Sequence, residues 1–123
     1  AYTRDRKAFG TTISAFQNTQ FVLAQLSAET TSLRVFTDWC IARFLDGELS
    51  AIDAAKVKLL STELQAKVVD QCLQLFGGYG YMREYPIARA FVDARLTRIG
   101  GGSIEIMKQI IGRSLFADPS PRT

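Results

Sequence analysis

The chain has 123 residues, a formal net charge of +3 and a hydrophobic content of 47%. This length fits one domain with a single packed core, and the composition excludes both a disordered chain and a membrane-spanning apolar run. Lysine and arginine are spread along the sequence, so nucleic-acid binding has little support. Histidine is absent, which excludes a Ser-His or Cys-His nucleophile and removes the commonest metal ligand, so no metal site is expected.

The polar N-terminal segment has neither an initiator methionine nor a signal peptide. We therefore interpret the sequence as part of a longer protein whose preceding helix is truncated, with one residual turn over Ala1 to Arg6. Two cysteines, Cys40 and Cys72, lie in apolar helical stretches and form no C-x-x-C pair. We expect both to be buried, reduced thiols.

The first long helix is predicted from Ser14 to Leu45. One apolar stripe at helical spacing comprises Val22, Leu26, Leu33, Phe36 and Cys40. A second stripe beside it comprises Phe21, Ala24, Ala28, Val35, Trp39 and Ala42. Two adjacent stripes make a wide apolar face, which suits burial between more than one neighbour. Gly47 is expected to end this segment in the left-handed conformation.

The second long helix is predicted to run from a cap at Ser50 to about Phe76. Asp53 stands three residues after Ser50, in the position that an acidic residue takes in a capping box. The predicted core stripe comprises Val57, Leu60, Leu64, Val68, Cys72 and Leu75. Gly77 ends the helix, and the short connection before Ser50 predicts that the two long helices are antiparallel neighbours.

Two shorter helices follow. Pro86 is placed as the first residue of a helix that runs to about Thr97 and stops at Gly100. Ser103 is expected to cap the last helix, with Glu105 in its first turn. The residues predicted to form the buried side of this helix are Ile106, Ile110, Ile111 and Leu115, and Asp118-Pro119-Ser120-Pro121 ends it.

No sustained alternation of apolar and polar residues indicates a strand. The predicted fold class is therefore all-α, an up-down four-helix-bundle-type domain with two long antiparallel helices and two shorter ones laid against them. We find no internal domain boundary, so residues 1–123 are treated as one domain.

Two glycine loops lie at predicted helix ends, where backbone groups lack partners. Gly77-Gly78-Tyr79-Gly80 follows no strand and is not followed by Gly-Lys-Ser/Thr, so neither a Rossmann nor a phosphate-loop motif fits. On spacing alone, a helix stop is the favoured interpretation of this loop. The run Gly100–Gly102 has more glycines than a turn needs, so close approach of a ligand is an equal alternative. This loop also leads into the positive end of a helix.

The order of these motifs resembles the C-terminal helical domain of the flavin-dependent acyl-CoA dehydrogenases over most of the chain. The matching pieces are R-x-x-F-G at Arg6 to Gly10, Gln17, Q-x-x-G-G at Gln74 to Gly78, Tyr85-Pro86 and the glycine turn before the last helix. The resemblance implies FAD as the cofactor. It also implies that Arg6 meets the diphosphate of FAD held by a neighbouring subunit, with Phe9 near the adenine.

The residues that the resemblance assigns to cofactor binding are Arg6, Phe9, Gln17, Gln74, Leu75, Phe76, Gly77, Gly78, Ser103, Ile104 and Glu105. Gly102 matches a backbone position beside the bound acyl thioester. Taken singly, Arg6 could be a solvated charge, either glutamine a surface amide and Glu105 only a first-turn residue. Asp93 and Arg95 are interpreted as structural ion partners, and the aromatic residues Tyr79, Tyr81 and Phe91 as packing residues.

The sequence departs from the resemblance at the catalytic base. Many family members have Tyr-Glu-Gly-Thr before the last helix, and this glutamate removes the α proton of the thioester while the flavin accepts hydride. Here the run is Gly100-Gly101-Gly102-Ser103, so Gly101 provides no base and no catalytic residue is assigned. The long-chain and isovaleryl branches place the base on an earlier helix, which here would precede Ala1. A base-less subunit of a heteromeric dehydrogenase is the second explanation, and the likeness of Ile99 to Ser103 to those branches favours the first.

The resemblance therefore predicts the FAD-binding and oligomerisation domain of an enzyme that oxidises acyl-CoA to trans-2-enoyl-CoA. It implies transfer of electrons to an electron-transfer flavoprotein, a homo-oligomer (dimer or tetramer), and a location in the bacterial cytoplasm or mitochondrial matrix. The domain by itself is expected to be inactive. The alternatives are a relative of acyl-CoA oxidase or nitroalkane oxidase, a base-less subunit, and a helical interaction module without a ligand.

Overall fold

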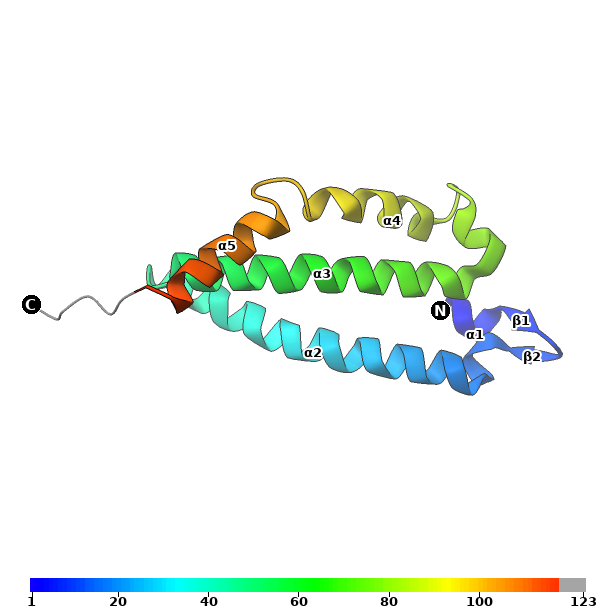
Figure 1. Cartoon of the computed structure of the whole chain (residues 1–123). Coiled ribbons are helices and arrows are strands. Elements are labelled where there is room, and N and C mark those ends of the chain that lie inside the picture. The colour runs from blue at the N-terminus through cyan, green and yellow to red at the C-terminus, as the bar shows by residue number, and fades with distance from the viewer. Residues whose placement is uncertain (118–123) are drawn as a thin grey trace, which may run out of the picture.

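The computed structural model describes residues 1–117, which are largely helical (Figure 1). The long elements are α2 (Gln17–Leu45), α3 (Ala51–Phe76), α4 (Pro86–Thr97) and α5 (Ile104–Leu115). The short ones are α1 (Tyr2–Asp5), β1 (Lys7–Ala8), β2 (Thr11–Thr12) and the 3₁₀ turns η1 (Ile13–Ala15) and η2 (Gly77–Tyr81). No helix within residues 1–117 combines the length and apolarity needed to cross a bilayer. The Asp118–Pro121 segment, predicted to end the last helix, lies outside the described residues.

Helix α3 is the central element of the domain. Helix α2 runs antiparallel to it on one side, while α4 and α5 follow one another along its other side (Figure 1). The all-α prediction, with two long antiparallel helices and two shorter ones against them, is confirmed. The described chain therefore forms three rows of helices with α3 in the middle.

Local sequence signals place most helix ends. The Ser50 hydroxyl accepts the backbone N–H of Asp53 at 3.0 Å and donates to its carboxylate at 2.7 Å, which confirms the predicted cap of α3. Pro86 is the first residue of α4, and Gly47 has a φ of 73° after α2. These ends agree with the sequence because capping needs only residues within one turn of the helix terminus.

The segment before α2 differs from the prediction. The helix begins at Gln17 rather than Ser14, because residues 13–15 form a 3₁₀ turn and Phe16 is extended. Ahead of this turn, β1 and β2 form an antiparallel hairpin with Lys7 paired to Thr12 and Ala8 to Thr11. Strands of two residues are too short to produce the alternation by which a strand is predicted.

The core is small and lies along both sides of α3. Its buried apolar residues are Leu26, Cys40, Ala55, Ala88, Ala94 and Met107. The first predicted stripe of α2 is buried or half-buried against α3, whereas the second stripe is exposed, with Phe21 at 63%, Val35 at 67% and Trp39 at 46%. Only α3 among the described elements offers α2 an extended partner, so one of its two apolar faces is left uncovered.

Four predicted core positions are wrong. Leu60 of α3 is half exposed, and α5 buries Met107 and half-buries Ile104 and Ile111, while Ile106, Ile110 and Leu115 are exposed. Helix α5 has apolar residues on more than one face, so its sequence alone did not show which face meets α3. Ile104, Met107 and Ile111 recur at steps of three and four, as one contacting helical face requires.

Several smaller predictions are also decided by the structure. The cysteines form no disulfide; Cys40 is buried but Cys72 is only half-buried, and burial raises the pKa of both thiols. Within residues 1–117, neither Asp93 nor Arg95 has an ion-pair partner, so their assignment as structural ion partners is wrong. The pairs that join helices are Arg98–Glu63, at 2.7 Å, and Lys67–Glu29, at 2.6 Å.

The three aromatic residues assigned to packing behave differently. Tyr79 stacks on Tyr85, with ring centroids 5.1 Å apart. Tyr81, in contrast, is 91% exposed, and Phe91 is 42% exposed. The packing interpretation therefore fits Tyr79 and is wrong for Tyr81.

Candidate functional site

The first candidate cluster surrounds a pocket of about 560 Å³ at the C-terminal end of α3. Its lining includes Arg6 from the segment after α1 and all of Gln74 to Gly78, with Tyr2, Ala8, Ile13, Tyr79 and Met82 completing the walls. The fold thus brings Arg6 to the second glycine motif although the two are far apart in sequence. Six of the predicted cofactor residues share this one pocket.

Aromatic contacts attach the N-terminal segment to α3. The ring of Tyr2 stacks on Phe76 with centroids 3.9 Å apart and an interplanar angle of 11°. The Tyr2 hydroxyl also donates to the carbonyl oxygen of Phe76 at 3.2 Å. Together these contacts fix α1 against the pocket, and so they determine where the following residue, Arg6, lies. Sequence reasoning missed Tyr2 because nothing local marks a contact across 74 positions.

Arg6 is held at the pocket by a ring rather than by a carboxylate. Its guanidinium carbon lies 5.0 Å from the centroid of the Tyr79 ring, within the range of a cation–π interaction. Among residues 1–117, the Arg6 side chain has no hydrogen-bond acceptor and no carboxylate partner. The guanidinium therefore keeps its N–H donors free for an anionic oxygen, and its planar fork suits phosphate.

Glycine is required where η2 turns back over α3. A Cβ on Gly80 would lie 2.6 Å from the carbonyl oxygen of Leu73, closer than such atoms can approach. Gly77 ends α3, as predicted, with a φ of 57° and a ψ of −136° that favour glycine. The glycine loop is thus both a helix stop and the wall of a pocket.

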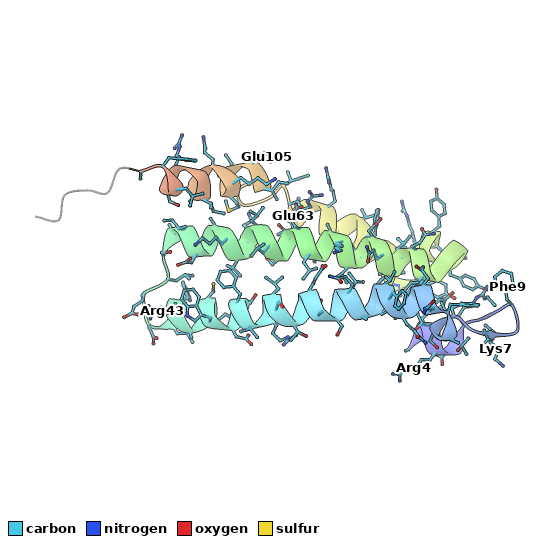
Figure 2. All side chains as sticks on the ribbon, turned by 60° about the horizontal axis from the view of Figure 1, so that its bottom comes forward. Arg4, Lys7, Phe9, Arg43, Glu63 and Glu105 are labelled. Atoms are coloured by element: carbon cyan, nitrogen blue, oxygen red, sulfur yellow. The ribbon has the colours of Figure 1, made fainter. Side chains whose placement is uncertain are left out.

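Phe9 projects from the tip of the β1–β2 hairpin (Figure 2). Phe9 has a φ of 52° and Gly10 a φ of 82°, the pattern of a type I′ two-residue turn. A positive φ is unfavourable for a bulky residue, yet the Phe9 side chain is 97% exposed and has only an edge contact with Phe16, with centroids 6.3 Å apart. Gln17, the other predicted residue of this region, is exposed at the start of α2 and does not line the pocket.

The second cluster is the glycine turn between α4 and α5. Gly101 and Gly102 have φ values of 62° and 89°, which side chains disfavour. The ammonium group of Lys58 in α3 donates to the carbonyl oxygens of Gly100, Gly101 and Gly102. Lys58 was not predicted as a site residue, because it is one of several lysines on α3 and lies more than 40 positions from the turn.

The start of α5 corrects one prediction. Ser103 occupies the N-cap position, but its side chain accepts no backbone N–H. Instead the neighbouring Ser103 hydroxyl lowers the pKa of the Glu105 carboxyl, with smaller contributions from the backbone N–H of Glu105, Lys108 and Arg98. A general base that works near neutral pH needs a pKa close to that pH. The lowered pKa of Glu105 therefore agrees with not assigning it as the base.

The two clusters lie apart. Lys58 and Gln74 stand towards opposite ends of α3, and a rise of 1.5 Å per residue separates them by about 24 Å. In Figure 2, Glu105 at the start of α5 and Phe9 on the hairpin also lie far apart along the molecule. The structure therefore places Arg6 beside Gln74–Gly78. Residues 102–105 lie in a separate cluster.

Comparisons with known proteins show the family to which the chain belongs. The family model described as acyl-CoA dehydrogenase, C-terminal domain, matches residues 1–116, so the chain belongs to the acyl-CoA dehydrogenase family. It is 45% identical to the mitochondrial long-chain specific acyl-CoA dehydrogenase of Rattus norvegicus, over 95% of this chain and 27% of that protein. It is 41% identical to the mitochondrial isovaleryl-CoA dehydrogenase of rice (Oryza sativa subsp. japonica), over 95% of this chain and 29% of that protein.

A solved structure shows the same fold. The acyl-CoA dehydrogenase from Geobacillus kaustophilus matches with a TM-score of 0.91 and 39% identity, over 94% of this chain and 30% of that one. The chain thus spans less than a third of the length of the relatives that it matches.

Proposed function

We propose that the chain is the FAD-binding and oligomerisation domain of an enzyme that oxidises acyl-CoA to trans-2-enoyl-CoA. The observation that carries this proposal is the convergence of Arg6 and Gln74–Gly78 on one pocket, with the guanidinium free of any carboxylate among the described residues. When bound, FAD would supply the hydride acceptor. The residues described below bind and orient it.

The pocket fits the phosphate-bearing part of a dinucleotide. Arg6 would bind diphosphate oxygens through its forked donors, and the Gln74 side chain and the backbone of residues 75–78 would contact the flavin. The exposed ring of Phe9 offers an apolar surface on which an adenine could pack. Gln17 does not line the pocket, so it would contact only a part of the same cofactor that extends outside the pocket.

The second cluster fits a different part of a cofactor and substrate. Ser103, Ile104 and Glu105 form the first turn of α5, where backbone N–H groups and the helix dipole favour an oxygen-rich group. The backbone of Gly102 would lie beside the acyl thioester. Because about 24 Å separates the clusters, we assign them to two half-sites: the Arg6 pocket serves the FAD of a neighbouring protomer, and the α5 turn serves the FAD of its own. This arrangement requires a homo-oligomer, a dimer or a tetramer.

The catalytic base would come from outside this chain. Gly101 stands at the base position of many family members and has no side chain, and the ionised Glu105 is a poor substitute. The identity with a long-chain and an isovaleryl enzyme supports a base on an earlier helix rather than a base-less subunit.

Electrons would then pass to an electron-transfer flavoprotein. The relatives include mitochondrial and bacterial proteins, which supports a mitochondrial matrix or bacterial cytoplasmic location.

The proposal is tested by measuring flavin content in the intact protein that carries this domain. Arg6→Ala and Gln74→Ala are expected to lower the FAD bound per protomer, about tenfold for Arg6→Ala, because a charge-assisted hydrogen bond contributes roughly 1.5–3 kcal/mol. Arg4→Ala is the matched control: it removes an exposed arginine of α1 that does not line the pocket, and should leave flavin content unchanged.

Two results would contradict the proposal. Unchanged flavin content in both Arg6→Ala and Gln74→Ala would favour a helical interaction module without a ligand. Rapid oxygen consumption by the wild-type protein on addition of acyl-CoA would favour an oxidase instead.

A further inference from the structure

Lys58 is fully engaged with the glycine turn. Its Nζ atom lies 2.7 Å from the carbonyl oxygen of Gly100, 2.5 Å from that of Gly101 and 2.6 Å from that of Gly102. An ammonium group has three donors, so these three hydrogen bonds use all of them. Within residues 1–117, Lys58 has no carboxylate partner. Its charge is therefore committed to the backbone of the turn.

This contact determines where the amide groups of the turn point. In a planar trans peptide the C=O and N–H groups point in opposite directions. Since three successive carbonyl groups face Lys58, the N–H groups of Gly101, Gly102 and Ser103 face away from it. The turn therefore has a carbonyl side, covered by α3, and an amide side.

The amide side is unpartnered in this domain. Within residues 1–117, no acceptor meets the N–H groups of Gly101, Gly102 or Ser103. The flanking residues differ: Gly100 donates to Leu96 at 2.8 Å, and Ile104 donates to Arg98 at 3.1 Å. Unpaired N–H groups cost free energy when they are shut away from water, so a bound group that covers this side must offer acceptors. Successive backbone N–H groups of this kind form concave sites for anionic or polar oxygens.

The ammonium group of Lys58 stabilises the shape of this turn. Gly101 and Gly102 are the least restricted residue type, and no side chain of the turn itself fixes them. Three carbonyl oxygens crowded around one point repel each other once the ammonium group is removed. On its other side Gly102 packs closely on α5, where a Cβ would lie 2.8 Å from the end of the Met107 side chain.

We infer that Lys58 is a positioning residue, which aims the N–H groups of Gly101, Gly102 and Ser103 at an oxygen acceptor of the bound cofactor or thioester. Lys58 touches no ligand itself and acts only through the turn. This inference rests on the proposed function, because the acceptor belongs to a flavin or an acyl-CoA.

The test uses the intact, FAD-loaded protein with the variants Lys58→Met and Lys58→Arg. Lys58→Met keeps the length of the side chain and removes the donors. Lys58→Arg keeps the charge, but a planar fork cannot reach three successive carbonyl groups as an ammonium does. The control is Lys67→Met, which removes another lysine of α3, one paired with Glu29 and remote from the turn. The readouts are FAD per protomer, the unfolding temperature, the reduction of the flavin on anaerobic addition of a saturated acyl-CoA, and the kcat per bound flavin and KM measured with an added artificial electron acceptor.

We expect Lys58→Met to keep its flavin and to lose about tenfold or more in kcat per flavin, a fraction of the 10²–10³-fold that removing an oriented donor costs. The kcat per flavin of Lys58→Arg should fall between those of Lys58→Met and the wild type, and that of Lys67→Met should equal the wild-type value.

A merely structural role would lower flavin content or unfolding temperature while kcat per flavin and KM stay unchanged, and that result overturns the inference. If Lys58→Met does not fold, Lys58→Arg decides: a reduced kcat supports the inference and a wild-type kcat overturns it. Wild-type protein that binds no FAD, or whose FAD acyl-CoA does not reduce, overturns the proposed function and the inference together.

Discussion

At the scale of single residues, Phe9 combines two unfavourable features. It has a positive φ, which costs roughly 1–3 kcal/mol for such a residue, and its ring is 97% exposed. Asparagine or glycine would suit this turn better if stability of the domain were the only requirement. A strained, exposed aromatic ring is therefore best explained by a partner that is outside the domain.

Phe9→Asn should consequently separate stability from binding. The free energy of unfolding is expected to stay equal or to rise, because asparagine tolerates the left-handed turn, while FAD bound by the intact protein falls. Tyr81→Asn is the control, since Tyr81 is similarly exposed but is not among the residues assigned to cofactor binding. Denaturant unfolding and flavin absorbance measure the two quantities. Loss of stability with full flavin content would show that Phe9 acts within the fold.

Single residues also show why sequence reasoning found only part of the site. Arg6 and Gln74 belong to motifs, so the sequence alone predicts them as site residues. Tyr2 and Lys58 belong to none, and their roles arise from contacts across 74 and more than 40 positions. Such contacts leave no local pattern of spacing or composition.

At the scale of elements, local sequence signals predict where the helices begin and end, but they do not predict which face of a helix is buried. Ser50, Gly77 and Pro86 fix helix ends through neighbouring residues, so those ends agree with the prediction. Helix α5 shows the opposite case. It has isoleucines on two faces, and only packing against α3 selects the face with Met107.

The cap of α3 gives a prediction for pH dependence. The Ser50 hydroxyl, and then Lys56, lower the pKa of Asp53 below its usual value of 3.8. A lowered carboxyl pKa contributes stability that is complete above the unfolded-state value and is lost as the pH falls through the lower folded-state value. Stability should therefore decline below about pH 4 partly through Asp53.

Ser50→Ala should lower the free energy of unfolding by about 1 kcal/mol at neutral pH. Asp53→Asn should flatten the dependence of that free energy on pH between 2 and 4. Ser32→Ala, on the exposed surface of α2, is the control for the serine change. Urea unfolding followed by circular dichroism at several pH values is the measurement. An unchanged slope in Asp53→Asn would show that this carboxylate is not held in the cap.

At the scale of the whole molecule, much apolar surface is uncovered. Helix α2 exposes Phe21, Val35, Trp39, Phe44 and Leu45, and a groove of about 730 Å³ with a mainly apolar floor runs between α2 and α3. Large exposed apolar patches mark sites of contact with other protein. This surface agrees with a domain that is covered by other domains or protomers in the intact protein.

The chain expressed alone is therefore expected to self-associate. Sedimentation velocity should show species larger than the monomer, and the double variant Trp39→Glu, Phe44→Glu should shift them towards monomer. Lys108→Glu, an exposed change on α5, is the control for added negative charge. A monodisperse monomer at micromolar concentration would contradict this prediction. The same chain should bind FAD weakly or not at all, because each half-site is incomplete.

The central claim is that the Arg6 pocket and the α5 turn contact two different flavins in an oligomer. The most direct measurement is a crystal structure of the intact protein with FAD. The account predicts diphosphate oxygens of one FAD at about 2.7–2.9 Å from the Arg6 guanidinium of a neighbouring protomer, and the α5 turn of its own protomer beside the same FAD. Arg6 and Gln74 facing solvent, far from any flavin, would contradict it.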